Sequence, residues 1–350
     1  MKRFNRVLSR IAAITDSENN SIELGLDTAI LIELDGKTFS SNYGSIRIEQ
    51  KSTYSTDFKI TLGKELAQNL GIGLQDFLEI VRLDDALFLV PISSQNLIPQ
   101  FFNISGAPEP RIIILSSHPD FESYTREIAT AIHQRLQEQS IPSLRIEPRE
   151  RVLEWNQKLD LTISRFDVDL TRNQYTPELI GEDIINKNPS YRILAESYFR
   201  LLSQVLHSQA NQVVIDFHGI ANASSRGIIH PMVLVGDAST QTPLVKSFVK
   251  TVEKLSRAVL PNLWIPYRSQ WGSVEYSLQL VKNTANIPII IEIRSDLREN
   301  FEIRSKLIDL ITKALINLVE QVSAHNIAPQ ERITYRPFQP PDLNQILYSI

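Results

Sequence analysis

The sequence predicts an α/β protein in which a small, mostly β domain precedes a larger domain built on a mostly parallel or mixed sheet with helices on both faces. Two patterns predict this fold. Residues 21–91 form short runs that alternate apolar and polar residues, separated by turn signals such as Asp35-Gly36. From residue 111 onward, wholly apolar runs typical of buried strands alternate with longer segments of helical periodicity. A length of 350 residues fits two domains.

Residues 1–20 are expected to form an exposed amphipathic helix. The basic start MKRFNRVLSR is followed by IAAI and then at once by polar and acidic residues, whereas a secretory signal needs a longer apolar stretch. No run approaches the roughly 20 apolar residues of a membrane span. We therefore expect a cytoplasmic protein that does not enter the membrane.

The β domain is expected over residues 21–91. Alternation predicts strands at 22–24, 29–34, 45–49 and 58–62, a helix from Gly63 to Leu70 closed by Gly71, and two strands, 77–82 and 86–90, joined at Asp84-Asp85.

Residues 58–91, FKITLGKELAQNLGIGLQDFLEIVRLDDALFLVP, resemble the AbrB-like swapped-hairpin module, with Gly63 where a proline is usual and Gln75 where a glycine is usual. The resemblance implies a homodimer formed through this module, which in that family often binds DNA. Residues 51–91 carry four basic and six acidic side chains, whereas DNA binding needs several basic side chains on phosphates. We expect dimerisation without nucleic acid.

Residues 92–110 contain three prolines among Ser, Gln, Asn and Gly and are expected to be a linker. The larger domain is expected over 111–327, and the proline-rich segment 328–350 is expected to lie on its surface. In the larger domain, apolar runs predict strands at 111–115, 213–217, 232–235 and 287–293, and helical periodicity predicts helices at 121–139, 244–259 and 307–322.

Metal-binding side chains follow two of the predicted strands. The chain has no cysteine, so a transition metal must be held by His, Asp or Glu. His118 follows the first strand of the larger domain and His218 ends the second. Because ligands bind beyond the carboxyl ends of strands in α/β sheets, we expect these histidines to share a zinc ion with one carboxylate, either Glu122 or Asp120.

Two further carboxylates suit the same centre. Glu292 ends the strand at 287–293 and is expected to act as the general base for the water that the metal activates. Asp216 lies two residues before His218 and could orient that histidine. A single histidine or glutamate at a strand end is more often a solvated surface residue, but three strand ends carrying suitable groups favour a site.

Four stretches resemble the N-formylglutamate amidohydrolase family, relatives of the zinc carboxypeptidases: IIILSSHPDFES, ISRFDVDLTRN (163–173), VVIDFHG and IIIEIRSDL (289–297). They match, in the family's order, the first metal-binding histidine, an R-y-v-v-D-L-N-R signature, a D-x-H strand end and E-I-R-x-D-L. The resemblance covers about residues 111–320. It implies a three-layer hydrolase-like fold and one zinc ion per subunit.

The resemblance also implies residues that act on the substrate. Arg172 would bind the carboxylate of an N-acyl (N-formyl) amino acid or of a peptide C-terminus, with Asn173 beside it, because a guanidinium pairs with a carboxylate through two hydrogen bonds. Arg165 and Arg294 would support substrate charge or the developing oxyanion. The signature asparagine is Thr171 here, and the family's His-Ser-Gly reads His118-Pro119-Asp120.

Two functions are therefore expected. The first is a zinc-dependent amidohydrolase or carboxypeptidase-like enzyme acting on a small N-acyl amino acid or a C-terminal peptide. The alternative is a regulatory protein that does not catalyse a reaction, in which an AbrB-like module is fused to a hydrolase-derived ligand-sensing domain. The departures at Thr171 and after His118 favour the alternative, and the ordered motifs favour the enzyme.

Overall fold

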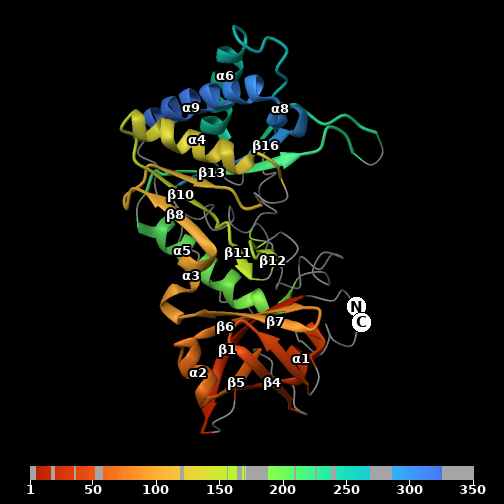
Figure 1. Ribbon diagram of the computed structural model, residues 1–350. Coiled ribbons are helices and arrows are strands. Elements are labelled where there is room, and N and C mark those ends of the chain that lie inside the picture. The colour runs from red at the N-terminus through yellow and green to blue at the C-terminus, as the bar shows by residue number, and fades with distance from the viewer. Residues whose placement is uncertain are drawn as a thin grey trace.

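The computed structural model describes residues 5–16, 20–34, 37–51, 58–118, 122–155, 157–163, 168, 170, 188–208, 210–224, 227–237, 242–268 and 286–324. A β-barrel forms one end of the molecule, and a sheet with helices forms the other (Figure 1). Of the helices in the described part of the chain, none combines the length and apolar character needed to cross a membrane.

The N-terminal part is a closed seven-stranded barrel with the strand order β1-β5-β2-β4-β3-β7-β6. Its interior is a core of mostly aliphatic side chains, and every strand and both helices contribute to it. The elements are β1 (Arg6–Thr15), β2 (Ser21–Leu24), α1 (Leu26–Ile32), β3 (Thr38–Ser41), β4 (Gly44–Gln50), β5 (Lys59–Gly63), α2 (Lys64–Leu70), β6 (Phe77–Leu83) and β7 (Ala86–Ile92).

Two sequence-based expectations for this part are wrong. The predicted N-terminal helix is the strand β1, which pairs with β5 on one side and β6 on the other. Val7 and Ile11 of β1 enter the barrel core while Leu8 faces a second core outside the barrel, so apolar residues are needed on both faces. The strand expected at 29–34 lies mostly in α1, whose Ala29 and Ile32 share one helical face and pack into the barrel.

The elements expected within the AbrB-like segment are all observed. Strand β5 leads into α2, which ends at Gly71 in the left-handed conformation, and the hairpin β6–β7 follows. Because the barrel is closed within one chain, its strands have no unpaired edge that a second copy must cover. Dimerisation through this module stays a prediction, as does the family assignment.

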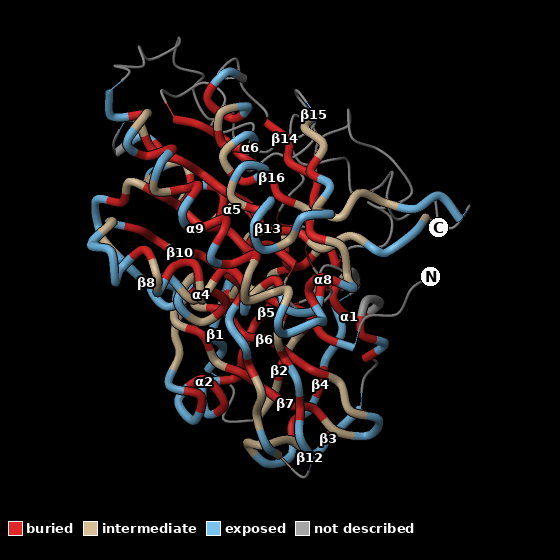
Figure 2. The backbone as a smooth tube through the Cα atoms, turned by 90° about the horizontal axis from the view of Figure 1, so that it is seen from above, coloured by how far each residue is buried: buried red, intermediate tan, exposed pale blue. Residues whose placement is uncertain are grey.

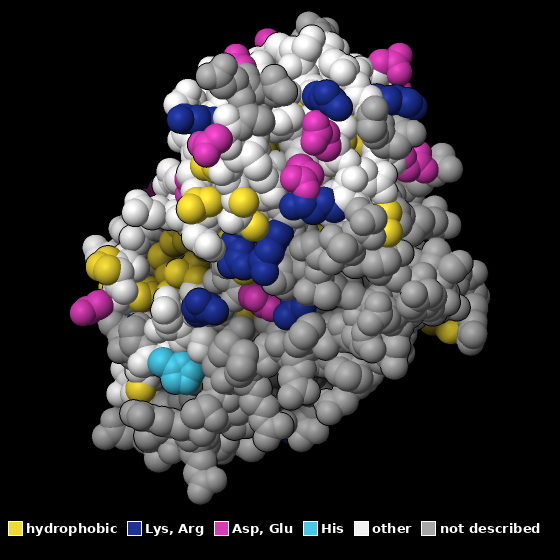
Figure 3. All heavy atoms as spheres, turned by 90° about the horizontal axis from the view of Figure 1, so that it is seen from below, with side chains coloured by type: hydrophobic (Ala, Val, Ile, Leu, Met, Phe, Trp, Pro, Cys, Tyr) yellow, Lys and Arg dark blue, Asp and Glu magenta, His cyan; other side chains and the backbone are white. Residues whose placement is uncertain are grey.

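The barrel surface mixes charges of both signs. Ion pairs join Arg47 to Glu49, Lys51 to Glu23 and Arg82 to Glu33 at 3.2, 2.7 and 3.5 Å. On the face shown in Figure 3, acidic side chains likewise lie beside Lys and Arg side chains.

The segment expected to be a linker is part of the fold. Residues 94–106 form a short 3₁₀ turn (Ser94–Asn96), α3 (Leu97–Phe101) and β8 (Phe102–Gly106). Strand β8 pairs antiparallel with β10 (Ser143–Pro148) and forms an edge of the second sheet. Phe101 and Phe102 are fully buried, which anchors the connection between the barrel and the sheet.

The second sheet has seven strands in the order β15-β14-β16-β13-β9-β10-β8. Its four central strands, β16, β13, β9 and β10, run parallel to one another, and β14 and β8 run antiparallel to their neighbours β16 and β10. This is the mixed sheet that the apolar runs predicted. Its remaining strands are β9 (Ile112–Leu115), β13 (Val213–Ile220), β14 (Val233–Asp237), β15 (Tyr267–Arg268) and β16 (Ile287–Arg294).

Helices lie against both faces of this sheet. Ile112 and Ile114 of β9 pack toward α4 (Thr125–Glu138), α6 (Thr242–Ser256) and α9 (Phe301–Ala324). Ile113 and Leu115 point the opposite way, toward α5 (Arg192–Ser208) and the barrel. The central strands are therefore buried along most of their length (Figure 2). A small hairpin, β11 (Val152–Trp155) and β12 (Gln157–Asp160), lies between the barrel and the sheet (Figure 1).

The barrel and the sheet share one hydrophobic core. The outward-facing residues Leu8, Phe77 and Val81 of the barrel belong to the same buried cluster as Tyr198 of α5 and Ile113 of β9. The barrel and the sheet are therefore held together by one continuous hydrophobic core, in contrast to domains that are connected only through a flexible linker.

A buried ionic network crosses the same junction. Glu79 of β6 is completely buried and binds Arg151 at 2.6 Å, with Arg6 at 3.9 Å and the hydroxyl of Tyr191 donating to it. Both arginines also donate to the carbonyl of Leu161. The network therefore connects two barrel strands to the β11–β12 region and to the start of α5.

Candidate metal centre

Three adjacent parallel strands carry the predicted residues to one edge of the sheet. Strand β13 lies between β9 and β16, and it is parallel to both. His118 follows β9 by three residues, His218 lies near the end of β13, and Glu292 lies near the end of β16. The expectation that these strand ends converge is confirmed.

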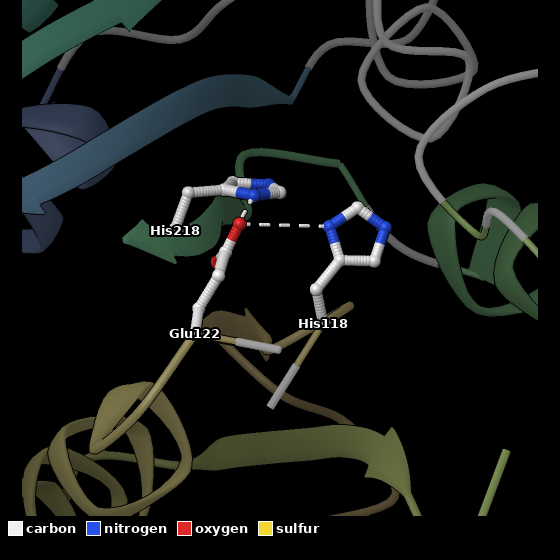
Figure 4. A group of neighbouring side chains, drawn as sticks. All are labelled: His118, Glu122 and His218. Atoms are coloured by element: carbon white, nitrogen blue, oxygen red, sulfur yellow. Dashed lines mark ion pairs between the residues drawn. The ribbon is translucent and has the colours of Figure 1, made fainter. Parts of the chain in front are cut away.

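Among the described residues, His118, Glu122 and His218 form a group able to hold a metal ion, with ligand atoms all within 4.8 Å of one another. Glu122 lies between the two imidazoles, as Figure 4 shows: its Oε1 is 3.7 Å from His118 Nδ1 and its Oε2 is 3.5 Å from His218 Nδ1. The ring centroids of the two histidines are 5.4 Å apart. All three residues are buried.

Backbone contacts orient Glu122. Its amide donates to the carbonyl of His118 at 3.0 Å. Its carbonyl accepts from the amide and the hydroxyl of Thr125 at the start of α4, at 3.1 and 2.7 Å. The amide of Gly219 donates to Oε2 at 2.7 Å. The carboxylate is thus directed toward the end of β13.

The surroundings of Glu122 favour its charged form. Burial alone raises the pKa of this carboxyl, but the close approach of His218 and His118 outweighs burial and holds the pKa well below its usual range. A carboxyl group must be ionised to bind a metal. Glu122 is therefore already ionised at neutral pH and can serve as a ligand without losing a proton.

Asp216 and Ser117 lie behind His218. Asp216 Oδ2 is 3.4 Å from His218 Nε2 and accepts a hydrogen bond from the hydroxyl of Ser117 at 2.9 Å. A carboxylate on the second ring nitrogen leaves the first nitrogen to face a metal, because it fixes the orientation of the imidazole. This is the arrangement expected for Asp216 from its position two residues before His218.

Glu292 is the direct cross-strand partner of His218. Partnered residues on parallel strands project from the same face of the sheet, so the Glu292 side chain leaves β16 on the side where His218 leaves β13. It is half-buried, whereas the three clustered residues are buried. The position suits a general base beside a metal, and that role stays a prediction.

The donor set fits a zinc ion. Two imidazole nitrogens and one carboxylate oxygen are ligands that catalytic zinc sites use, and such sites leave a fourth position open. A tetrahedral zinc with bonds of about 2.0–2.1 Å holds its ligand atoms about 3.4 Å apart. The ligand atoms of this group all lie within 4.8 Å of one another, so small side-chain movements would bring them to that spacing. Of the two carboxylates expected as candidates, Glu122 lies with the histidines, and Asp120 lies outside the described residues.

The side chain of Arg294 forms hydrogen bonds within the protein. Its guanidinium forms two hydrogen bonds with Asp296, both 2.7 Å long, and a third with the carbonyl of His230 at 3.1 Å. The paired Asp296 raises the pKa of this arginine further. Its predicted support of substrate charge is not tested, and Arg165, Arg172 and Asn173 lie outside the described residues.

The other described histidines have structural contacts. His133 is buried in α4 and hydrogen bonds the hydroxyl of Ser143, and His207 is exposed in the last turn of α5 with the carbonyl of Ser203 as its partner. His230 is half-buried, and its carbonyl is held by Arg294. None of the three belongs to the cluster described above.

Sequence reasoning missed three residues at the centre: Ser117, Gly219 and Arg298. Ser117 and Gly219 are the immediate neighbours of His118 and His218, and their adjacency to those histidines was the available signal. Arg298 lies six residues after Glu292, in α8 (Ser295–Glu299), and is buried. A buried arginine has no signature in a single sequence, because nothing in the pattern separates it from a solvated one.

No family model matches this sequence, and no curated protein matches it. Among solved structures, it is similar to a gene product of Agrobacterium tumefaciens (TM-score 0.42, 11% identity, covering 64% of this chain and 96% of that one). It is also similar to a bacteriophage poly-gamma-glutamate hydrolase (0.36, 11%, 63% and 91%) and to a metallo-carboxypeptidase from Burkholderia cenocepacia (0.36, 11%, 70% and 78%). Because every one of these TM-scores is below 0.5, the likenesses establish neither fold nor activity.

Proposed function

We propose that this chain is a metal-dependent hydrolase of amide bonds, with one zinc ion held by His118, Glu122 and His218. One observation carries the proposal: these three buried side chains converge within 4.8 Å at the carboxyl ends of parallel strands, and Glu292 stands beside them as the cross-strand partner of His218. A zinc ion in such a site polarises a carbonyl and lowers the pKa of a water ligand to about 7.

The residues of the chain divide the remaining work. Asp216, held by Ser117, keeps the imidazole of His218 in one orientation, and Gly219 keeps the carboxylate of Glu122 directed at it. Glu292 takes the proton from the attacking water and passes it to the nitrogen of the departing amine, so that the amine leaves as a neutral molecule.

The proposed substrate carries a free carboxylate next to the scissile amide, as in an N-formyl or other N-acyl amino acid or at a peptide C-terminus. The support is the motif at 163–173, in which Arg172 supplies a guanidinium for that carboxylate. Because Arg172 lies outside the described residues, a matched pair of substrates is the direct test. Blocking the carboxylate as an amide should abolish hydrolysis, and Arg172→Gln should raise KM for the free acid far more than it lowers kcat.

The main test combines metal analysis with Glu292→Gln. The purified chain should contain one zinc per subunit and should hydrolyse members of a panel of N-formyl amino acids, N-acetyl amino acids and dipeptides, with activity lost in a chelator. Glu292→Gln should keep its zinc and lose about 10²- to 10⁴-fold in kcat, the usual contribution of a general base. The matched control is Glu302→Gln on α9, an exposed glutamate paired with Lys306.

Two results would contradict the proposal. Full activity in Glu292→Gln would remove the assigned base. A chain without stoichiometric metal that shifts DNA in a gel would instead favour the regulatory alternative, with the AbrB-like segment as its binding module.

A further inference from the structure

A buried arginine stands directly behind the candidate metal centre. We propose that Arg298 is the positioning residue that holds Glu122 against the end of β13 and so sets the geometry of the metal ligands. The inference rests on the proposed function, since it concerns the metal that His118, Glu122 and His218 would hold. A guanidinium only donates hydrogen bonds and does not bind a metal ion, so Arg298 would act through its neighbours.

The guanidinium of Arg298 joins two segments that carry site residues. Its Nε donates to the carbonyl of Ile293 at 2.8 Å, one residue beyond Glu292 in β16, and its Nη1 donates to the carbonyl of Ser123, one residue beyond Glu122. Arg298 is only 4% exposed. A buried group that binds two backbone carbonyls fixes the distance between them, because releasing either would leave a buried charge with fewer partners.

The same guanidinium lies flat against Gly219. A Cβ atom at position 219 would be 2.4 Å from Cζ of Arg298 and 2.6 and 2.8 Å from its two terminal nitrogens. Gly219 is the residue whose amide binds Glu122 Oε2, and it directly follows His218. The absence of a side chain at 219 therefore lets the arginine approach the backbone that follows His218 and donates a hydrogen bond to Glu122.

Charge completes the arrangement. Burial lowers the pKa of Arg298, and the carboxylates of Glu122 and Glu299 act in the opposite direction by favouring its charged form. Glu299 is exposed, whereas Glu122 is buried with the histidines. A fixed cation beside Glu122 offsets part of the cost of burying that carboxylate before any metal arrives, and it does so without occupying a ligand position.

The test measures zinc affinity by competition with a chromophoric chelator, and separately the absorption spectrum of the Co²⁺-loaded protein. Arg298→Met should weaken zinc binding about 10- to 100-fold, the range for loss of a group that orients metal ligands. Gly219→Ala should weaken it as well, because its Cβ displaces the guanidinium. Arg298→Lys should recover part of the affinity, since an ammonium can donate to one of the two carbonyls.

The control is Arg135→Met, which removes an arginine that joins α4 to α9 through Asp309. It should leave zinc affinity and the Co²⁺ spectrum unchanged, and it should cost little stability because this ion pair is partly exposed. Circular dichroism and urea unfolding of the metal-free proteins identify any variant that is simply unfolded, and Arg298→Lys serves as the test if Arg298→Met does not fold.

The outcomes separate the two proposals. Wild-type zinc affinity and an unaltered Co²⁺ spectrum in folded Arg298→Met or Arg298→Lys would overturn the positioning role and leave the proposed function standing. If these variants bind zinc more weakly while the wild type binds zinc but hydrolyses no member of the panel, the positioning role would be supported and the proposed hydrolase activity would be contradicted. A wild type that binds no metal would overturn both.

Discussion

Glu79 offers the clearest test of how the barrel is attached to the sheet. The carboxylate is completely buried and accepts from Arg151 and Tyr191, with Arg6 nearby. Glu79→Gln keeps the shape of the side chain and removes its charge. The arginines, 5% and 6% exposed for Arg151 and Arg6, would then be two buried cations with no carboxylate between them.

The expected cost follows from that imbalance. Removing one partner of a buried ion pair usually costs about 3–5 kcal/mol, because the remaining charge stays out of water. The carbonyl of Leu161 still accepts from both arginines, so we expect the lower half of this range, about 3 kcal/mol. Adding Arg151→Met should cost less than the sum of the two single changes, since the second change removes one of the stranded charges.

The assay is urea unfolding followed by two signals. Trp155 packs against Phe88 of the barrel, with ring centroids 5.6 Å apart, so its fluorescence, measured after Trp264 and Trp271 are replaced by Phe, reports on the junction. Far-ultraviolet circular dichroism reports on the helices. Coincident transitions are expected because the barrel and the sheet share one core. The control is Glu49→Gln, which removes the exposed pair with Arg47 and should cost less than about 1 kcal/mol. A Glu79→Gln cost no larger than that of the control would refute this account of the junction.

Three further outcomes are expected. The pKa of His133 is lowered, mainly by burial and to a smaller extent by the charge of Arg145. The imidazole therefore takes up a proton more readily in the unfolded chain than in the folded chain. The unfolding free energy should therefore fall as pH drops below about 6.5, and His133→Gln should flatten that slope in urea titrations at several pH values. Gly106→Ala places a Cβ 2.0 Å from the carbonyl oxygen of Ser143 at a φ of 128° and should cost at least about 2 kcal/mol more than Gly44→Ala, where the space is open; equal melting temperatures for the two would contradict this. Asp216→Asn should lower zinc affinity about 10- to 100-fold in the same chelator competition, because the orienting carboxylate beside His218 is lost, and unchanged affinity would show that Asp216 does not orient it.

The core strands and the long helices could be predicted from the sequence because their signals are local. The apolar run at 287–293 covers all of β16 except its last residue, and the periodicity at 307–322 lies within α9. The two wrong elements show where local signals fail. The segment Arg6–Thr15 is basic and partly apolar in isolation, and it is a strand because its two faces enter two different cores. Neither core can be recognised in a window of ten residues.

The features of the metal centre can likewise be separated into those that follow from local sequence and those that depend on tertiary structure. By itself, the sequence determined that His118 and His218 follow buried strands, that no cysteine is available as a ligand, and that Glu292 ends a third strand. These are properties of single segments, and an α/β sheet aligns the ends of its parallel strands. Only the tertiary structure decided that Glu122 is the carboxylate found with the histidines, that Glu292 is in register with His218, and that Arg298 packs against Gly219. Each of these depends on the register of neighbouring strands and on a few ångströms of side-chain packing, which arise from contacts between residues far apart in the chain.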